Sequence, residues 1–391
     1  MANIQRQYNN LDKLIKENRV TVIYGARRTG KTTLVNEYLS TQRTKNILAT
    51  TGDDIITREI LSSNSSKKLL EWTEDYDIVF IDEAQNIPNI GQGLKLLIDQ
   101  RPGLNIIVTG SASFDLANKV GEPLVGRQTP LQLFPISILE LKKDQNIHEI
   151  RQNFADYLIF GMYPEVLTAK TKTNKKSILD ELSRSYLLKD ILQLESVKNP
   201  TTLFRLLSLL AHQIGNEAST NELASKLGID KNTVARYLYL LEKCYVIYNL
   251  RGFSRNLRNE VTKTGKYYFY DVGVRNAIIQ NYSPIEIRND VGHLWENFLI
   301  MERIKKQTYK NIYANNYFWR TWEKQEIDFV EERNGKLYAY EFKWGHKSHQ
   351  NPPDQWQSQY GPVAEYTVIN QENSVEFIAW GTIFLPQVLT T

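Results

Sequence analysis

Short apolar runs alternate with amphipathic stretches over the first 140 or so residues of the chain. The runs TVIYG, NILAT, DIVFID and LNIIVTG are almost wholly apolar, which is typical of strands that are buried on both faces. Stretches with helical spacing, such as KTTLVNEYLS and GQGLKLLIDQ, lie between them. This alternation predicts an α/β region in which a parallel sheet carries helices on both faces. The segment LFPISILELKK then leads out of the region.

The pattern changes twice further along the chain. Residues from about 150 to 265 carry apolar side chains at helical spacing, which predicts a helical region. Beyond about residue 290 an amphipathic helix, VGHLWENFLIMERIKKQ, precedes three strand-like runs, NIYANNYFWRTW, EIDFVEE and KLYAYEFKW. The last two are joined through Asn334-Gly335, a dipeptide that is typical of two-residue hairpin turns. We therefore divide the chain into residues 1–145, 146–265 and 266–391.

Composition narrows the class of protein only a little. The chain has 391 residues, of which 41% are hydrophobic and 24% charged, which suits globular domains with buried cores. A single cysteine, Cys244, excludes a disulfide within the chain and suits a reducing compartment. The polar first residues lack the apolar core of a signal peptide, and no apolar run reaches the length of about 18 residues that a membrane helix needs. We expect a cytoplasmic protein without a membrane partner.

The clearest chemical motif is a phosphate-binding loop. The segment GARRTGKT, from Gly25 to Thr32, fits G-x-x-x-x-G-K-[ST] at every fixed position and lies between a strand and a helix. Backbone N–H groups and the helix N-terminus favour a bound phosphate there. Lys31 is expected to reach the β- and γ-phosphates, and the Thr32 hydroxyl to ligate Mg²⁺. The sequence predicts a site for ATP and Mg²⁺, with the nucleotide held by Gly25, Ala26, Arg27, Arg28, Thr29, Gly30, Lys31, Thr32, Thr33 and Ser111.

A second motif, DIVFIDEAQ, ends an apolar strand in two carboxylates, Asp82 and Glu83. Such a pair is costly at the end of a buried strand unless it faces a cation or water. We expect Asp82 to contact Mg²⁺ through water, and Glu83 to polarise the water that attacks the γ-phosphate. Thr109 and Ser111, at the end of the next strand, could sense the γ-phosphate, although their hydroxyls also suit an ordinary turn. Arg127 could act as an arginine finger, in the same chain or toward a neighbouring subunit.

These motifs resemble one family, the bacterial and archaeal AAA-type ATPases with a C-terminal domain of unassigned function. The resemblance runs, in chain order, through GARRTGKTTL, FIDEAQ, VTGSAS, GRQTPLQLFPIS, FGMYPEV, YLLKDI, YFYDVGVRNA, WENFL, EIDFV and EFKW. It implies an AAA-like ATPase core, a helical region with a winged helix-turn-helix, and a C-terminal α+β module similar to PD-(D/E)XK restriction endonucleases. A second sensor arginine in a small helical lid is not evident, which departs from the pattern of a standard hexameric motor.

The middle region contains a candidate reader of nucleic acid. NELASKLGI followed by DKNTVARYLYLLEK has the pattern of a helix-turn-helix, with Gly228 in the turn and Asp230 in position to cap the second helix. Between Lys226 and Lys266 there are nine Lys or Arg residues and three Asp or Glu residues, a net charge of +6 against +4 for the whole chain. Such a stripe fits phosphate contacts, although packing or dimerisation would suit the same fold. The candidate contacts are Lys231, Asn232, Arg236, Arg251, Arg255 and Arg258.

The C-terminal module contains a candidate nuclease site. Asp328, Glu341 and Lys343 have the spacing D-x12-E-x-K, and Glu341 and Lys343 point to the same side of one strand. The hairpin can bring Asp328 beside them, and Glu296 lies on the preceding helix. In such nucleases two or three of these acids would hold Mg²⁺, while the lysine orients water or stabilises the transition state. A nuclease fold that has become a binding module is the alternative.

Three functions follow from these motifs. The leading prediction is an ATP-hydrolysing switch or remodeller that acts on DNA through its C-terminal half. One alternative is an ATP-regulated, Mg²⁺-dependent nuclease. The other is a non-catalytic regulator in which ATP or ADP gates the interaction with a protein partner or with further copies of the chain.

Overall fold

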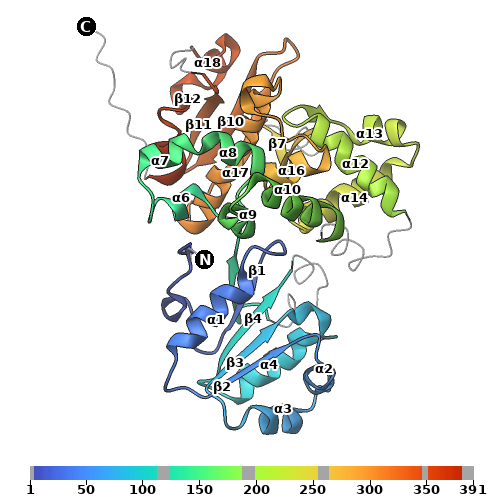
Figure 1. Cartoon of the computed structure of the whole chain (residues 1–391), viewed down its shortest axis with the longest axis vertical. Helices are drawn as coiled ribbons and strands as arrows, with labels where there is room; N and C mark the ends of the chain where they lie inside the picture. The colour runs from blue at the N-terminus through green and yellow to red at the C-terminus, as the bar shows by residue number, and fades with distance from the viewer. Residues whose placement is uncertain (1–3, 112–123, 187–198, 254–263, 346–350, 381–391) are drawn as a thin grey trace.

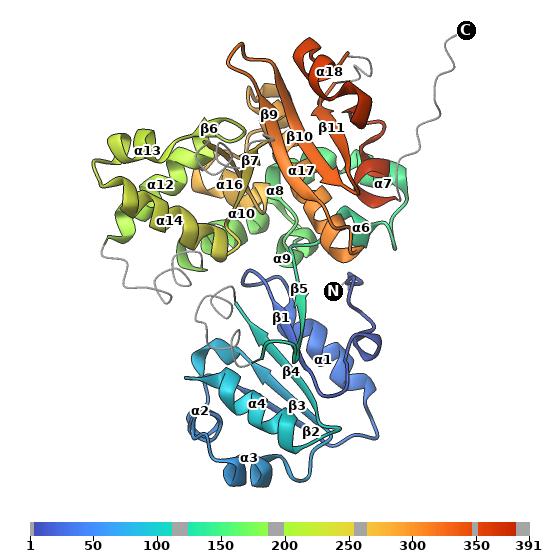
Figure 2. The ribbon, with the colours of Figure 1, turned by 180° about the vertical axis from the view of Figure 1, so that it is seen from behind.

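The computed structural model describes residues 4–111, 124–186, 199–253, 264–345 and 351–380. The chain forms two lobes, which Figure 1 shows one above the other and Figure 2 shows from behind. The N-terminal lobe, coloured from blue to cyan, is a sheet with helices around it. The second lobe, coloured from green to red, contains the helical region and a second sheet.

Parallel strands form the sheet of the N-terminal lobe. Its five strands lie in the order β2-β3-β4-β1-β5, and every neighbouring pair is parallel. Their bounds are β1 (Val20–Tyr24), β2 (Ile47–Thr51), β3 (Ile78–Asp82), β4 (Asn105–Gly110) and β5 (Gln128–Gln132). The sequence pattern predicts the first four strands. It does not predict β5, because QTPLQ is mostly polar and contains Pro130, which an edge strand tolerates.

Helices cover both faces of this sheet, as predicted. On one face α1 (Lys31–Thr41) buries Leu34 and Val35 in a cluster with Ile23 and Phe80. The other face is covered by α2 (Ile55–Ser62), α3 (Ser66–Thr73) and α4 (Ile90–Gln100). This arrangement leaves the carboxyl ends of β1, β3 and β4 free to carry polar groups, which is where parallel α/β sheets place their sites.

The helical part of the second lobe begins directly after β5. Gly228, with φ of +68°, ends α13, and the Asp230 carboxylate caps α14 by accepting from the Asn232 N–H at 2.8 Å, as predicted. Among the described residues no helix is long and apolar enough to cross a membrane. The helices are α6 (Ile138–Leu141), α7 (Ile147–Gln152), α8 (Phe154–Phe160), α9 (Pro164–Thr168), α10 (Lys172–Glu181), α12 (Pro200–His212), α13 (Thr220–Leu227), α14 (Lys231–Lys243), α16 (Val272–Ile278) and α17 (Val291–Tyr309).

A seven-stranded sheet completes this lobe in the order β12-β11-β10-β9-β7-β8-β6. The predicted hairpin turn joins β10 to β11, with φ of +52° at Asn334 and +74° at Gly335. After residue 290 the order is helix, three strands, helix α18 (Asp354–Tyr360) and a strand parallel to β11, followed by α19 (Ser374–Ala379). The strands are β6 (Glu217–Ala218), β7 (Ile247–Gly252), β8 (Gly265–Phe269), β9 (Asn315–Arg320), β10 (Glu326–Arg333), β11 (Lys336–Phe342) and β12 (Ala364–Ile369).

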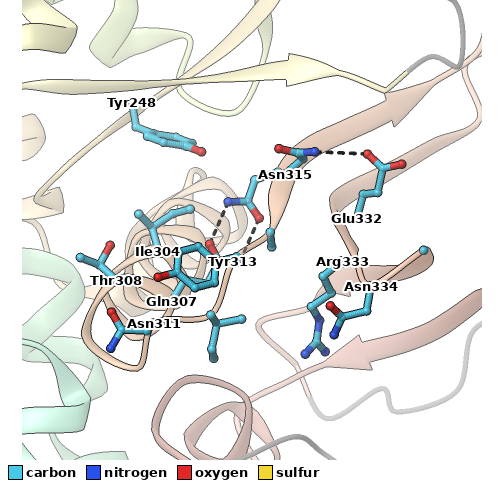
Figure 3. Close-up of a pocket in the computed structure, with 14 residues that line it drawn as sticks. Tyr248, Ile304, Gln307, Thr308, Asn311, Tyr313, Asn315, Glu332, Arg333 and Asn334 are labelled. Atoms are coloured by element: carbon cyan, nitrogen blue, oxygen red, sulfur yellow. Dashed lines mark hydrogen bonds between the residues drawn. The ribbon is translucent and has the colours of Figure 1, made fainter. Parts of the chain in front are cut away.

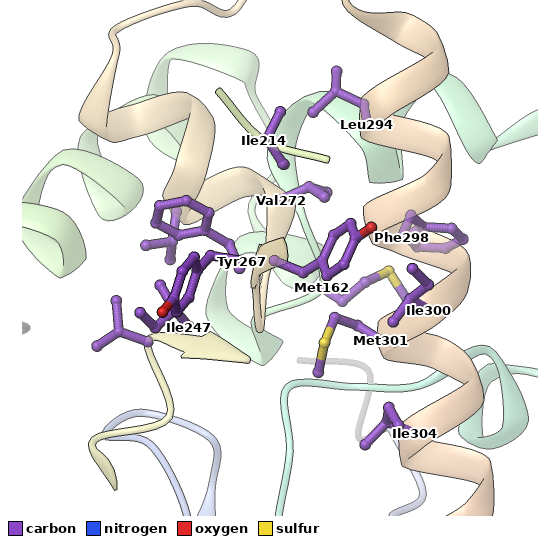
Figure 4. Close-up of a cluster of buried hydrophobic side chains, with 14 of the residues drawn as sticks. Met162, Ile214, Ile247, Tyr267, Val272, Leu294, Phe298, Ile300, Met301 and Ile304 are labelled. Atoms are coloured by element: carbon purple, nitrogen blue, oxygen red, sulfur yellow. The ribbon is translucent and has the colours of Figure 1, made fainter. Parts of the chain in front are cut away.

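The larger of two hydrophobic cores in the second lobe joins the helical region to the sheet. Figure 4 shows Met162, Ile247, Tyr267 and Val272 gathered beside Phe298 of α17, although these residues come from both sides of residue 265. The boundary that we expected at residue 265 falls between β7 and β8, which pair with each other. The helical region and the C-terminal module therefore share one core and one sheet instead of packing as separate units.

Candidate functional site

The phosphate-binding loop connects the end of β1 to the start of α1. Gly25 lies so close to the chain after β5 that a Cβ atom there would be 2.0 Å from the Leu133 carbonyl oxygen. Gly30, with φ of +94°, turns the loop into the first residue of α1. These two positions require glycine for different reasons, close approach at the first and a left-handed backbone at the second.

Lys31 is folded into the loop that precedes it. Its side chain is buried, and its ammonium group donates to the carbonyl oxygens of Gly25 and Ala26, both at 2.9 Å. Thr29 is also buried, and its hydroxyl donates to the Ala26 carbonyl oxygen at 2.9 Å. The ammonium group thus lies inside the curl of the loop, where it can exchange these carbonyl contacts for an anion.

Hydroxyl and carboxylate groups meet at the ends of three neighbouring elements. The Thr32 hydroxyl, on α1, is 2.9 Å from one oxygen of Asp82 and 3.1 Å from the other. The Thr109 hydroxyl, at the end of β4, donates to the same carboxylate, and Ser111 is buried directly after that strand. Threonine and aspartate oxygens are the ligands that Mg²⁺ prefers, so the residues present fit this ion. Thr109 contacts Asp82, an interaction that the sequence did not indicate.

Glu83 follows Asp82 in a left-handed conformation, with φ of +49°. Its N–H donates to the Thr109 hydroxyl at 3.3 Å, and its carboxylate accepts from the side-chain amide of Gln85. Gln85 is buried, with 8% of its surface exposed. Sequence reasoning missed Gln85, although a buried glutamine two residues after the expected catalytic acid is a signal that could have been used.

The loop also contacts the second lobe. One terminal nitrogen of Arg28 donates to Glu165 of α9 at 3.1 Å, and the other donates to Glu181 of α10 at 2.8 Å. Arg6, which is buried, forms an ion pair with Glu140 at 2.9 Å and donates to the Thr29 carbonyl oxygen. Two arginines thus connect the phosphate-binding loop to residues that follow β5.

A cavity of about 700 Å³ lies beside the N-terminus of α1, between the lobes. Its lining comes from the N-terminal segment, from α1 and from the chain around α9 and α10, and it includes Ile4, Gly30, Leu34, Ile136, Pro164 and Ile178. Most of the lining surface is apolar, although Arg6, Thr33, Glu37, Glu165, Thr168 and Asn174 also line the cavity. Sequence reasoning could not find this cavity, because its walls come from segments more than 100 residues apart.

Arg127 lies far from the phosphate-binding loop. It precedes β5, and its carbonyl oxygen accepts from the N–H of Val20, at the opposite end of β1 from the loop. Its guanidinium forms an ion pair with Asp99 at 3.0 Å. A finger role within the same chain is therefore wrong, because β1 separates Arg127 from the phosphates by its whole length.

The helix-turn-helix presents part of the predicted basic face. Lys231, Asn232 and Arg236 are exposed on α14, and Arg251 is exposed on β7. Arg255 and Arg258 lie outside the described residues. The pattern of exposure places Asn232 and Arg236 on one side of the helix, since residues four apart are neighbours on a helical surface.

The predicted nuclease residues come together, but they do not form a metal site. The Asp328 carboxylate accepts from the Phe342 N–H at 2.8 Å, next to Glu341, which accepts from Lys343 at 2.6 Å. Burial raises the pKa of Asp328, and the nearby carboxylates of Glu296, on α17, and Glu341 act in the same direction. Within the described ranges no three acidic, histidine or cysteine side chains could hold a metal ion. Metal ligation by Glu296, Asp328 and Glu341 is thus not supported, because a lysine enters this cluster, as described below.

A second cavity, of about 920 Å³, is rich in carboxamide groups and was not predicted (Figure 3). It lies where α17 ends, beside the start of β9 and the turn between β10 and β11. Gln307 and Asn316 bond to each other through both amides, at 2.9 and 2.8 Å. Its other carboxamides are Asn311, Asn315 and Asn334.

A parallel sheet of this order, a phosphate-binding loop after β1 and an Asp–Glu pair at the end of β3 define an α/β domain of the P-loop class. In agreement, residues 17–142 match the family described as AAA domain. Residues 151–284 match a domain of unknown function, DUF8612, and residues 291–387 match another, DUF4143.

Several curated proteins are similar to much of the chain. An uncharacterized protein of Mycobacterium tuberculosis is 29% identical over 271 residues, which cover 68% of this chain and 58% of that protein. An uncharacterized protein of Methanocaldococcus jannaschii is 24% identical over 331 residues, which cover 80% of this chain and 72% of that protein. The chain therefore spans little more than half the length of the mycobacterial relative.

Solved structures resemble the chain more distantly. AMPPCP-bound DnaA from Aquifex aeolicus is 17% identical with a TM-score of 0.30, over 61% of this chain and 85% of that one. Drosophila ORC bound to DNA is 12% identical with a TM-score of 0.23, over 71% of this chain and 94% of that one.

Proposed function

We propose that the protein binds ATP at the phosphate-binding loop and hydrolyses it. The observation that carries the proposal is the convergence of Lys31, Thr32, Asp82 and Glu83 at one end of a parallel sheet. Lys31 would bind the β- and γ-phosphates, and Thr32 and Asp82 would hold Mg²⁺. The ion supplies neutralising charge on the phosphate oxygens when bound. Glu83 would orient the attacking water and accept its proton.

The cavity between the lobes supports this proposal and suggests how the nucleotide acts. A volume of about 700 Å³ falls in the usual range of small-molecule pockets, and its mainly apolar lining suits a base. Because the lining comes from both lobes, a bound nucleotide would contact both of them. The protein would then work as an ATP-dependent switch in which the nucleotide state sets how the lobes engage.

Calorimetry and a turnover assay test the proposal with two variants. Lys31→Ala should lose ATP binding, because it removes the buried charge of the loop. Glu83→Gln should retain affinity and slow turnover by a factor of about 10²–10⁴, as expected when a positioned base is lost. Lys67→Ala, at an exposed lysine of α3, serves as the matched control. Undiminished ATP affinity in Lys31→Ala would refute the proposed site.

A second candidate activity is binding of DNA by the helix-turn-helix. The observation that favours it is the exposure of Lys231, Asn232 and Arg236 on α14, with Arg251 exposed on β7. Each lost phosphate contact reduces the slope of log affinity against log salt by about 0.9. The variant Lys231→Ala/Arg236→Ala/Arg251→Ala should therefore bind duplex DNA more weakly and flatten the slope by about 2.7. An unchanged slope would favour the alternative, a face that contacts a protein partner.

A further inference from the structure

A buried lysine lies inside the carboxylate cluster of the C-terminal sheet. Lys266, on β8, has only 2% of its side chain exposed. Its ammonium group donates to Glu326 of β10 and lies 3.6 Å from Oε1 of Glu296 on α17. The same group lies 5.4 Å from the ring centre of Phe318 on β9. One cation thus contacts three different elements of the C-terminal module.

The acids around Lys266 are also engaged by groups of the protein. The Tyr268 hydroxyl donates to Oε1 of Glu296 at 2.5 Å, and Nδ1 of His293 lies 3.7 Å from Oε2. Asp328 accepts from a backbone N–H, as described above, and Glu341 accepts from Lys343. Arg320 lies 3.8 Å from Glu326. Every carboxylate of the cluster therefore has a protein donor or cation beside it.

This arrangement does not fit the divalent ion that the nuclease resemblance implies. A Mg²⁺ site needs several oxygen atoms directed at one point, usually with carboxylates that carry full charge. Here the cation among the carboxylates is an ammonium group, and a carboxylate that faces a fixed ammonium has lost much of its attraction for a second cation.

The position of Lys266 on β8 suggests a second role, in which it connects the β7–β8 hairpin to the C-terminal sheet. The hairpin of β7 and β8 follows α14, and in the described part of the chain β7 pairs with β9 at Arg251–Tyr317 and Gly252–Phe318. The side chain of Asn297 on α17 also bonds to the backbone of Phe269 on β8. The side chain of Lys266 also connects this hairpin to Glu326 of β10 and to Glu296 of α17. Lys266 and Glu296 are both buried, whereas Glu326 is partly exposed, so loss of Lys266 would leave the buried Glu296 charge without its cation.

We propose that Lys266 is the built-in cation of this cluster, so that the C-terminal sheet takes no divalent metal and the cluster instead fastens the helix-turn-helix unit to that sheet. Lys266 is thus a positioning residue for the predicted nucleic-acid face. The second lobe then acts as one body that presents α14, and Glu296 and Glu326 serve this attachment through their contacts with Lys266.

Titration of the nucleotide-free full chain with Mn²⁺ tests the proposal independently of the ATP site. Differential scanning calorimetry of the parent protein should show no Mn²⁺-dependent rise in Tm that Asp328→Asn removes. Lys266→Met should lower Tm, and it should gain a Mn²⁺-dependent rise of several degrees that the added change Asp328→Asn removes. Lys343→Met, the matched control, deletes the other lysine of the cluster and should stay insensitive to Mn²⁺, because Lys266 remains.

Hydrogen exchange tests whether Lys266 attaches the β7–β8 hairpin to the C-terminal sheet. In Lys266→Met, the amides of β7 and β8 should exchange at least about tenfold faster, while those of α1 stay unchanged. If Lys266→Met does not fold, Lys266→Arg should preserve both the slow exchange and the insensitivity to Mn²⁺. Saturable Mn²⁺ binding by the parent protein that Asp328→Asn abolishes would overturn the proposal. So would a folded Lys266→Met that gains no response to Mn²⁺.

Discussion

Arg28 of the phosphate-binding loop donates to Glu181 of α10 at 2.8 Å, so a residue beside the expected phosphates holds a carboxylate of the other lobe. Glu165 of α9 lies 3.1 Å from the same guanidinium. Arg28 has a left-handed backbone, with φ of +58°. Both glutamates are about half exposed, so each pair should contribute at most about 1 kcal/mol to stability.

We predict that Glu165→Gln/Glu181→Gln binds ATP more tightly than the parent, by about threefold to tenfold. The change removes two negative charges near the polyphosphate and releases Arg28 to contact it. Calorimetric titration at low and high salt measures the effect, which should shrink as salt screens the charges. Glu71→Gln, on α3, is the control, because this carboxylate pairs with Lys67 at the surface. Equal affinities of the double variant and the parent would mean that Arg28 has no part in binding.

A second prediction concerns the amide that holds Glu83. Gln85→Leu should lower kcat by about tenfold, since one hydrogen bond to a charged group is worth about 1.5–3 kcal/mol and part of the positioning survives. The dissociation constant for ATP should change little, because the side-chain amide of Gln85 donates to the Glu83 carboxylate, which is assigned to hydrolysis and not to binding. Asn86→Ala is a matched control, since the neighbouring amide donates to Asp53 instead. A loss of affinity with unchanged kcat would contradict the assigned role.

The nucleotide site could be predicted because its residues are contiguous in two short motifs. The order strand, loop and helix fixes where Lys31 and Thr32 lie, and an apolar strand carries Asp82 to the same edge of the sheet. The hairpin turn at Asn334-Gly335 and the cap at Asp230 were predictable for the same reason, since each depends on a few neighbouring residues.

Features that depend on distant segments could not be predicted in this way. Arg127 was a candidate arginine finger, yet the parallel register of β5 with β1 places it at the end of the sheet away from the phosphate-binding loop. In the sequence, Lys266 is the last of the basic residues counted from Lys226. The folding of the seven-stranded sheet brings it beside Glu326 and Glu296. Charge along the sequence does not reveal which side chains a sheet will bury together.

The buried pair of Arg6 and Glu140 yields a prediction about stability. Arg6→Met should destabilise the protein by about 3–5 kcal/mol, because it leaves Glu140 charged and buried without its partner. Glu140 keeps hydrogen bonds from Ser137 and from the Gln7 N–H, but these donors carry no charge. Chemical denaturation measures the loss. The double variant Arg6→Met/Glu140→Leu should recover part of it, since no unpaired charge remains, and a double variant less stable than Arg6→Met would contradict this account.

The last prediction rests on Lys306, a buried lysine of α17 that donates to the Phe377 carbonyl oxygen at 2.7 Å. Burial, with the nearby cation Arg303, lowers the pKa of Lys306 from 10.5 to about 7, although Glu331 opposes the shift. Arg333 and Lys142 also face it and act in the same direction as Arg303. Between these two pKa values the unfolded chain holds a proton on Lys306 that the folded chain lacks. Stability should therefore rise as the pH increases from about 7 toward 10.

Lys306 should add up to about 1.4 kcal/mol per pH unit to the slope of the free energy of unfolding against pH in that window. Below pH 7 this slope vanishes, because Lys306 is protonated in both the folded and the unfolded chain. Lys306→Met should remove this slope and raise stability at pH 7, because an uncharged side chain replaces one that is costly to protonate. Denaturant midpoints at pH 7, 8 and 9 measure it against Lys336→Met, a control at an exposed lysine of β11. Parallel pH profiles for the parent and Lys306→Met would show that Lys306 keeps its proton when the chain folds.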